Sequence, residues 1–407
     1  MSKTSMRPIR ETIPLEEARA LMRQAARPIE RVETIALDGA NQRVLARAVV
    51  ADQDVPPFSR AAMDGYAVVA EDTFGAGQFD PRVLRLVDKV YTGQVPTRPV
   101  ARGTCAEIAT GAPMPPGADA VVMVEETEKD EAGGVRIFGP VYPGQNVGRQ
   151  GADIRAGQAL FAPGDHLTPS RLGAIAALGL DRVEVFARPR IATLSTGNEI
   201  AAPGGPLGPG QIYDINRFTL GAIITEHGGV PVPYPTSADT LDDLNRALDQ
   251  CLAEDLVIFS GGSSVGERDL ILDAIAGRGE VIFHGIAVKP GKPTLFGVID
   301  GKPVLGMPGY PTSCLSNGYM LLVPLLRRMA RLPDAAPRSV RLPLGQRIVS
   351  TTGRHQFYTV RIVDGIAMPA FKASGDITSM SQADGYVEIP AQTDIAEKGE
   401  IVEVRLF

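Results

Sequence analysis

Apolar residues recur at helical spacing near the start of the chain. The segment "PLEEARALMRQAAR" at 14–27 places them on one face, and Pro14 suits a position in the first turn of a helix. This face consists of Leu15, Ala18, Leu21, Met22 and Ala25. The pattern predicts an amphipathic helix over 14–27.

Short β-branched runs replace the helical pattern from about 51 to 144. The runs "RVLRLVDKVY", "DAVVMVEET" and "GVRIFGPV" are separated by clusters of Gly and Pro, which is typical of strands joined by turns. Around 145–184 the helical pattern returns with "TPSRLGAIAALGL", where Thr168 suits the cap and Pro169 the first turn. An all-β insert within an N-terminal α/β region is therefore predicted.

Strands and helices alternate from 188 to about 331. The helix expected in "DTLDDLNRALDQCLAED" would be capped by Asp239, and "EVIFHGIAVKPG" reads as one strand. A final long helix is expected from "YPTSCLSNGYMLLVPLLRRMARL", with a kink at Pro324. Alternation at this spacing predicts a mostly parallel sheet with helices on both faces.

The last part of the chain reads as a small β domain after a Pro-containing linker, "RLPDAAP". The predicted fold is therefore a multi-domain α/β plus β protein. Its predicted parts are an N-terminal linker and dimerisation domain (1–50 and 145–187), an inserted β domain (51–144), an α/β domain (188–331) and a C-terminal β domain (332–407).

Composition narrows the class of protein. Among 407 residues, 41 basic and 47 acidic side chains give a net charge of −6, and no run of Lys and Arg suggests a nucleic-acid partner. Cys105, Cys251 and Cys314 are far apart and form no CxxC pair, which favours a reducing compartment. The polar N-terminus and the short apolar run "YMLLVPLL" suggest neither a secretory signal nor a membrane span. A soluble, cytoplasmic protein is expected.

Two predicted strands end in similar sequence motifs. "TLSTGNE" and "IFSGGSSVGERD" each end in a turn of small residues followed by an acid, Glu199 or Asp269. Such turns suit an anion, because glycine lets the backbone approach a ligand and helix N-termini present N–H groups. The acids would repel a bare phosphate unless they hold Mg²⁺, which prefers carboxylate, water and phosphate oxygens. The alternative is a pair of ordinary β–α turns with capping acids.

Two further loops suit an anion. "VKPGKP" places Lys289 and Lys292 in a stiff loop between strands, which would suit a small oxyanion if these lysines are not simply solvated. "GMPGYPTS" ends a strand and opens a helix at Pro311, although any Pro-initiated helix would look the same.

The predicted insert contains two more Gly- or Pro-rich stretches, "PPFSRAAMDGYAV" and "ATGAPMPPGADAVV". Asp64 in the first could reach across a dimer or only form a tight turn, and Thr110 lies in the turn of the second.

These motifs, in order, resemble a known family. "PFSRAAMDGYAV", "ATGAPMPPGADAVVMVEE", "HLTP", "STGNE", "SGGSSVGERD", "VKPGKP" and "GMPGYP" are similar to segments of the MoeA and gephyrin E-domain family, the molybdopterin molybdenumtransferases, over nearly the whole chain. The resemblance implies an elongated homodimer of four-part subunits whose α/β domain is of the molybdopterin-binding type. It also implies a Mg²⁺-dependent reaction that transfers molybdenum from molybdate to adenylated molybdopterin and releases AMP.

The resemblance implies roles for individual residues. Asp64, Glu199 and Asp269 would be catalytic, with Glu199 and Asp269 as metal ligands. The oxyanion would be held by Lys289, Lys292, Ser313 and Arg354. The remaining substrate contacts would come from Thr110, Asp153, Ser195, Thr196, Gly197, Ser260, Gly261, Gly262, Ser263, Gly266, Pro308, Pro311 and Ser374.

The chain departs from the family pattern at three places. The family's "PGNP" is Pro308-Gly309-Tyr310-Pro311 here, "GED" is Gly151-Ala152-Asp153, and "STGDE" carries Asn198. Tyr310 would border the oxyanion pocket and could mark a paralogue with weak turnover or with altered oxyanion choice, for example tungstate instead of molybdate.

Two other classes stay open: a nucleotide enzyme of the molybdopterin adenylyltransferase kind, and a non-catalytic molybdopterin-binding or scaffold protein. Partners expected beside a second copy of the chain are a molybdopterin adenylyltransferase and molybdenum-enzyme maturation proteins.

Overall fold

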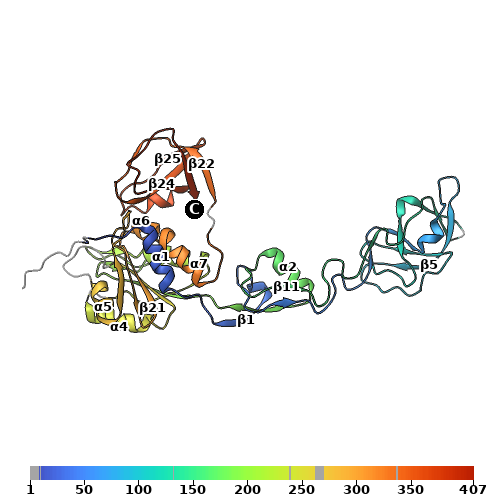
Figure 1. Ribbon diagram of the computed structural model, residues 1–407, viewed down its shortest axis with the longest axis horizontal. Coiled ribbons are helices and arrows are strands. Elements are labelled where there is room, and N and C mark those ends of the chain that lie inside the picture. Colours follow the sequence, from blue (N-terminus) through green and yellow to red (C-terminus); the bar gives the residue numbers. More distant parts are fainter. Residues whose placement is uncertain (1–8, 10, 132, 238–239, 262–269, 336–337) are drawn as a thin grey trace, which may run out of the picture. The chain divides into compact units, whose positions relative to one another are not determined.

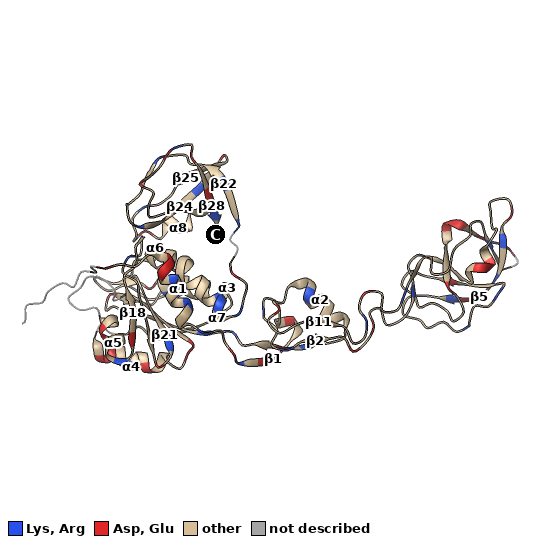
Figure 2. Cartoon of the chain, viewed as in Figure 1, with Lys and Arg blue, Asp and Glu red and all other residues tan. Residues whose placement is uncertain are grey.

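A computed structural model describes residues 9, 11–131, 133–237, 240–261, 270–335 and 338–407 (Figure 1). The chain forms two compact units. The first contains Met1–Thr34, Gln42–Val44 and Glu184–Phe407, and the second contains Ile35–Asn41 and Leu45–Val183. Basic and acidic residues are interspersed along the elements of both units (Figure 2).

The second unit contains the predicted all-β insert, which is confirmed. Its six-stranded sheet has the order β7-β4-β6-β5-β9-β8, with only β5 and β6 parallel. Separate apolar clusters pack around Tyr66 and Val68 and around Ala67 and Ala106, because successive side chains alternate between sheet faces. The strands are β4 (Gly65–Val68), β5 (Arg82–Val90), β6 (Thr104–Ile108), β7 (Ala120–Met123), β8 (Thr127–Lys129) and β9 (Gly134–Ile137).

Outside this sheet, residues 32–186 form three short pairs of strands and the α-helix α2. Helix α2 (Pro169–Ala177) begins as predicted, with Thr168 at the cap position and Pro169 as its first residue. The paired strands are β1 (Val32–Ala36) with β12 (Arg182–Phe186), β2 (Val49–Val50) with β11 (Ala159–Phe161), and β3 (Arg60–Ala61) with β10 (Val147–Gly148).

The first unit is organised by a six-stranded sheet with the order β16-β13-β17-β21-β20-β18. The first four strands pair in parallel, and β20 pairs antiparallel with both β21 and β18, so the sheet is mostly parallel as predicted. An Asp300-Gly301 turn joins the antiparallel pair β20 and β21. The strands are β13 (Arg190–Ser195), β16 (Val230–Pro233), β17 (Leu256–Ser260), β18 (Glu280–His284), β20 (Leu295–Ile299) and β21 (Lys302–Met307).

Helices cover both faces of this sheet, as predicted (Figure 1). Strand β17 shows why: Leu256 and Ile258 pack into one core, while Val257 and Phe259 pack into the other. The first core receives α1 (Leu15–Ala25), α3 (Asn216–Glu226), α6 (Pro311–Asn317) and α7 (Val323–Met329); the second receives α4 (Leu241–Cys251) and α5 (Leu270–Arg278). Helix α1 buries the predicted face.

Helix α4 begins one residue later than expected. Its cap is Thr240, whose Oγ1 accepts a hydrogen bond from the backbone N–H of Asp243 at 3.1 Å, so the expected cap at Asp239 is wrong. Asp239 itself lies outside the described residues.

The final long helix is interrupted before Pro324. A π-helical segment over Gly318–Leu322 separates α6 from α7. Proline has no N–H for the carbonyl four residues earlier, so the Met320 carbonyl needs another donor. Arg19 on α1 supplies it through Nε at 2.8 Å. A π-helical segment thus precedes Pro324 at the place of the predicted kink, and α1 supplies a donor to the Met320 carbonyl.

The C-terminal β domain is also confirmed. Its sheet has the order β19-β24-β26-β28-β22, with β19 (Val288–Lys289) at one edge and β25 (Ile366–Pro369) beside β24. The other elements are β22 (Ser339–Pro343), β24 (His355–Val363), α8 (Thr378–Ser381), β26 (Gly385–Ile389), β28 (Ile401–Leu406), and the pair β23 (Ile348–Val349) and β27 (Ile395–Ala396).

The strand β19 (Val288–Lys289) corrects one prediction. The run "EVIFHGIAVKPG" was expected as a single strand, but it forms β18 and then β19, which belong to different sheets. Val288 pairs with His355, so the lysine loop is attached to the C-terminal sheet. No helix among the described residues is long and apolar enough to cross a membrane.

Candidate active site

A cavity of about 1090 Å³ lies in the first unit, where β13, β17 and β21 end and the C-terminal β domain faces them. Ligands of open α/β sheets bind at this kind of edge. The predicted site residues that line the cavity are Ser195, Thr196, Glu199, Ser260, Gly261, Lys289, Lys292, Pro308, Pro311, Ser313, Arg354 and Ser374. Residues far apart in the sequence are therefore brought to one cavity.

The floor of the cavity is made by strand ends in close contact. Ser195 lies beside Ser260, with 3.5 Å between their Oγ atoms. Gly261 has φ +101°, and a Cβ atom there would lie 2.5 Å from the Thr196 carbonyl oxygen. Only glycine fits this approach, which leaves backbone rather than side chain at the surface of the turn. Gly197, in the neighbouring turn, does not line the cavity.

The continuation of the second turn lies outside the described residues. Gly262, Ser263, Gly266 and Asp269 fall within 262–269, so their predicted roles stay predictions.

Two carboxylates line the described part of the cavity. Glu199 is exposed, whereas Asp214 is buried and accepts a hydrogen bond from the Arg217 backbone N–H at 3.0 Å. Sequence reasoning missed Asp214, because a polar residue just before a helix resembles an ordinary cap. It also missed Asn216, whose Nδ2 donates to the Gly309 carbonyl at 2.9 Å and fixes the third strand-end turn.

The lysine loop is held on both sides. Lys289 Nζ donates to Thr351 Oγ1 at 2.9 Å, and Lys292 Nζ donates to the Ile9 carbonyl at 2.9 Å. Buried Asn317 donates to the Gly291 carbonyl at 2.9 Å, and a Cβ at Gly291 would lie 2.3 Å from the Asn317 Oδ1 atom. Asn317 is therefore a positioning residue that the sequence did not reveal.

The start of α6 connects the sheet to the C-terminal domain. The Thr312 N–H donates to the Ser374 carbonyl at 3.2 Å, and Thr312 Oγ1 donates to the Asp376 carbonyl at 3.0 Å. These bonds bring Ser374 to the same cavity as Ser313. Tyr310 precedes this helix, lines the cavity and is 65% exposed, so its phenol is available to a ligand.

Thiol chemistry is not available here. All three cysteines are free and buried, and burial raises the pKa of Cys105 and of Cys251 to about 12. Burial, reinforced by Asp214, also raises the pKa of Cys314. Because the thiolate is the reactive form, these residues are structural at neutral pH.

The predicted residues of the β insert lie in the second unit. Asp64 Oδ1 accepts hydrogen bonds from the backbone N–H and Oγ1 of Thr110, at 2.6 and 2.9 Å. The backbone bond is the main cause of the lowered pKa of Asp64, followed by the side-chain bond. Asp153 has an exposed side chain, and its N–H donates to the Val55 carbonyl. The Asp64–Thr110 contact thus brings two of the predicted site residues together.

Three stretches of the chain match MoeA-type families. Residues 13–179 match the MoeA N-terminal region (domain I and II), 192–328 a probable molybdopterin binding domain, and 341–407 the MoeA C-terminal region (domain IV). Fold and site thus define a multi-domain protein built around a molybdopterin-binding type of α/β domain. The chain belongs to the MoeA family.

Named relatives support this assignment. A protein of Mycobacterium tuberculosis named molybdopterin molybdenumtransferase 2 is 36% identical over 382 residues, which is 91% of this chain and 93% of that protein. A Nostoc molybdopterin molybdenumtransferase is 31% identical, and the match covers 91% of this chain and 88% of that protein. The crystal structure of a molybdopterin biosynthesis MoeA protein from Pyrococcus horikosii superposes with a TM-score of 0.84 at 40% identity, covering 97% of this chain and 99% of that one.

Proposed function

We propose that this chain is a molybdopterin molybdenumtransferase that acts in molybdenum cofactor biosynthesis. It would take molybdate and adenylated molybdopterin, place molybdenum on the dithiolene of the pterin, and release AMP. The proposal rests on one observation: the turns at the ends of the strands and the cationic side chains of Lys289, Lys292 and Arg354 line the same cavity.

The two substrates would occupy different parts of the cavity. The turns at Ser195-Thr196 and Ser260-Gly261 suit the nucleotide and its pyrophosphate, because their small residues let a ligand approach the backbone closely and their hydroxyl groups line the cavity. The lysines, Arg354 and Ser313 suit a tetrahedral oxyanion, since cationic donors make short, strong hydrogen bonds to anionic oxygens. Holding both substrates in one cavity aligns the reacting groups.

The donor set also fits Mg²⁺. This ion takes one or two carboxylates together with water and phosphate oxygens, and Glu199 lines the cavity near buried Asp214. Glu199 and Asp269 are the proposed ligands. The described residues contain no group of three or more His, Cys, Asp or Glu side chains that could hold a metal ion without help from the substrate. Bound Mg²⁺ would neutralise phosphate charge.

The same proposal includes a homodimer in the cytoplasm. Asp64, tied to Thr110, would serve the active site of the partner subunit. Mixing Asp64→Ala with Asp269→Ala subunits should then restore activity through hybrid dimers, and a purely monomeric protein at micromolar concentration would contradict this arrangement. A molybdopterin adenylyltransferase would supply the substrate, and molybdenum-enzyme maturation proteins would receive the product.

The exposed phenol of Tyr310 favours one variant of this function, a paralogue with altered oxyanion choice. The Tyr310→Asn variant should change the ratio of molybdate to tungstate affinity and leave unfolding unchanged. Identical titrations of both oxyanions with parent and variant would remove Tyr310 from oxyanion selection.

The decisive experiment follows AMP release from adenylated molybdopterin by the purified full-length protein with Mg²⁺ and molybdate. Release that depends on molybdate supports the proposal. Binding without release, with intact molybdenum-enzyme activity after gene deletion, would indicate a scaffold protein. ATP-dependent adenylation of molybdopterin would instead indicate an adenylyltransferase.

A further inference from the structure

A second cavity of about 570 Å³ lies elsewhere in the first unit, and the two cavities share no lining residue among those described. Its walls come from α1, the end of α3, the π-helical segment with α7, and the C-terminal strands β26 and β28. This volume falls within the range of roughly 300–1,000 Å³ that is usual for small-molecule sites.

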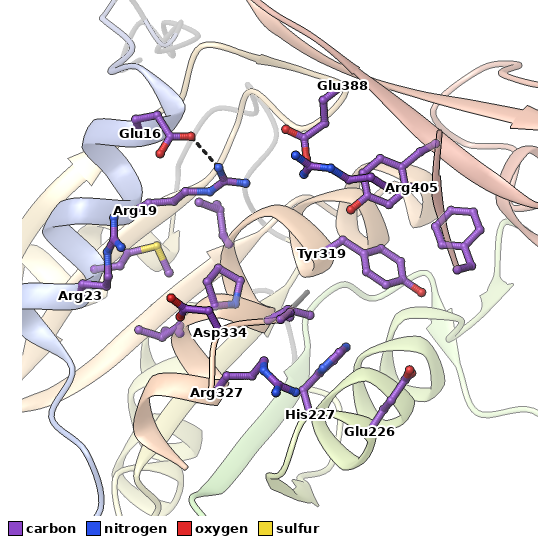
Figure 3. A pocket seen from close by; sticks show the side chains of 18 of the residues that line it. Glu16, Arg19, Arg23, Glu226, His227, Tyr319, Arg327, Asp334, Glu388 and Arg405 are labelled. Carbon is purple, nitrogen blue, oxygen red and sulfur yellow. Dashed lines mark hydrogen bonds and ion pairs between the residues drawn. The ribbon is translucent and has the colours of Figure 1, made fainter. Parts of the chain in front are cut away.

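Guanidinium groups surround the cavity. Five arginines and four acids line it, so arginine charge exceeds carboxylate charge by one. Figure 3 shows Arg19, Glu388 and Arg405 toward one side, Arg327 and His227 toward the other, and Tyr319 between them. Charged groups and aromatic rings thus line the same cavity.

Two of these arginines are committed to protein partners. Arg19 bonds Met320 and pairs with Glu16, and Arg405 pairs with Glu388. By contrast, the side chains of Arg23 and Arg338 are exposed and have no hydrogen bond or ion pair with any described residue. Two free guanidinium groups that line one cavity, one from α1 and one from the segment before β22, are suited to bind an anion.

Arg327 adds a partly desolvated charge. Its Nε donates to the Pro333 carbonyl at 2.6 Å, and burial lowers the pKa of its guanidinium while Asp334 acts in the opposite direction. Arginine stays charged despite such a shift, so the desolvated cation gains from an anionic ligand.

Three aromatic rings line the cavity and lie against one another. Tyr319, Tyr386 and Phe407 form a cluster with centroid separations between 5.2 and 6.1 Å. Burial, followed by the charge of Glu226, raises the pKa of Tyr319 to about 12, so its hydroxyl stays neutral and can donate. A flat apolar body could therefore lie against rings while its charge meets arginine.

We propose that this cavity binds a small organic anion, with a carboxylate or phosphate group held by Arg23, Arg338 and Arg327 and an apolar body placed against Tyr319 and Phe407. The binding is distinct from the proposed transfer reaction and does not depend on it. Because the arginines of the cavity exceed its carboxylates by one positive charge, the ligand is expected to carry a small negative charge.

The proposal is tested by calorimetric titration of the full-length protein with phenyl phosphate, using benzyl alcohol as the uncharged probe. Phenyl phosphate should bind in the millimolar range or tighter and benzyl alcohol should bind more weakly. Arg23→Gln and Arg338→Gln should each weaken binding about three- to tenfold, because both contacts are partly exposed, and the pair of substitutions should weaken it further.

Matched variants separate this cavity from the candidate active site. Arg27→Gln removes an exposed arginine that does not line the cavity and should leave the affinity unchanged. Lys289→Gln should also leave it unchanged, because Lys289 lines the other cavity. Binding that is lost in Lys289→Gln but kept in Arg23→Gln and Arg338→Gln, or an absence of phenyl phosphate binding, would overturn the proposal.

Discussion

The candidate active site and the arginine-lined cavity are built in opposite ways. The candidate active site is lined largely by turns at strand ends, where glycine, serine and proline keep the backbone close to the ligand space. The second cavity is lined by long side chains that project from helices and C-terminal strands. The first therefore depends on local backbone geometry, and the second on tertiary packing.

This difference decides what a sequence can reveal. A strand-end turn is contiguous, so its chemistry appears as a motif such as "SGG" or "VKPGKP". The second cavity joins Arg19 to Met320, which are separated by 301 positions, and no local pattern records that contact. Sites made of turns are visible in a single sequence, whereas sites made by packing are not.

The largest effect is expected at the acid of the first cavity. Glu199→Gln should lower turnover by roughly a hundredfold or more, the scale expected when a positioned catalytic group is lost. Stability should change little, because Glu199 is exposed and makes no side-chain hydrogen bond to described residues. Asp269→Ala is expected to act similarly.

AMP release at saturating molybdate measures this effect. Glu17→Gln, at an exposed position of α1, is the matched control and should retain the parental rate. Parental turnover in Glu199→Gln would remove Glu199 from the catalytic residues of the first cavity.

The next effect concerns the oxyanion. Lys292→Ala should raise the molybdate concentration for half-maximal transfer about ten- to hundredfold, because a charge-assisted contact contributes about 1.5–3 kcal/mol. Lys398→Ala, at an exposed residue of the C-terminal domain, is the control for loss of one positive charge. Superimposable molybdate titrations of the two variants would remove the oxyanion site from this loop.

Much of the fold could be predicted because its signals are local. The apolar face of α1, the Thr168-Pro169 helix start and the apolar strand runs reflect spacing within a few residues. The division of β18 from β19 could not be predicted, because an apolar run does not show that Val288 will pair with His355. Tertiary pairing overrode the local pattern there.

The residues of the candidate site also differ in whether a local sequence pattern could reveal them. The strand-end turns and the lysine loop were evident from residue types, whereas Arg354 and Ser374 came only from the family resemblance. Asn317 gave no signal, since a buried amide inside a helix acts through its contact with the Gly291 carbonyl. Roles that depend on a distant partner require the fold.

A smaller effect tests the packing of the second cavity. Arg19→Ala leaves the Met320 carbonyl without its donor and should destabilise the protein by about 1–2 kcal/mol. Pro324→Ala provides a backbone N–H four residues after Met320, so the loss of Arg19 should cost less in that background. Denaturant unfolding of the two single variants and the double variant measures this coupling. Strictly additive losses would mean that Arg19 does not compensate for Pro324.

The smallest effect concerns acid stability at the edge of the second cavity. Burial tends to raise the pKa of Glu388, but the hydrogen bond from His355 and the charges of Arg405, His355 and Arg19 outweigh it and hold the pKa below its ordinary value of 4.5. The carboxylate therefore stabilises the fold above pH 4.5, and this contribution is lost as pH falls through the lower pKa of the folded state. Glu388→Gln should be less stable than the parent above pH 4.5 and should lose less stability on acidification, because it has no proton to take up. Denaturant unfolding at a series of pH values tests this, and parallel stability curves for parent and variant would show that Glu388 does not contribute to acid sensitivity.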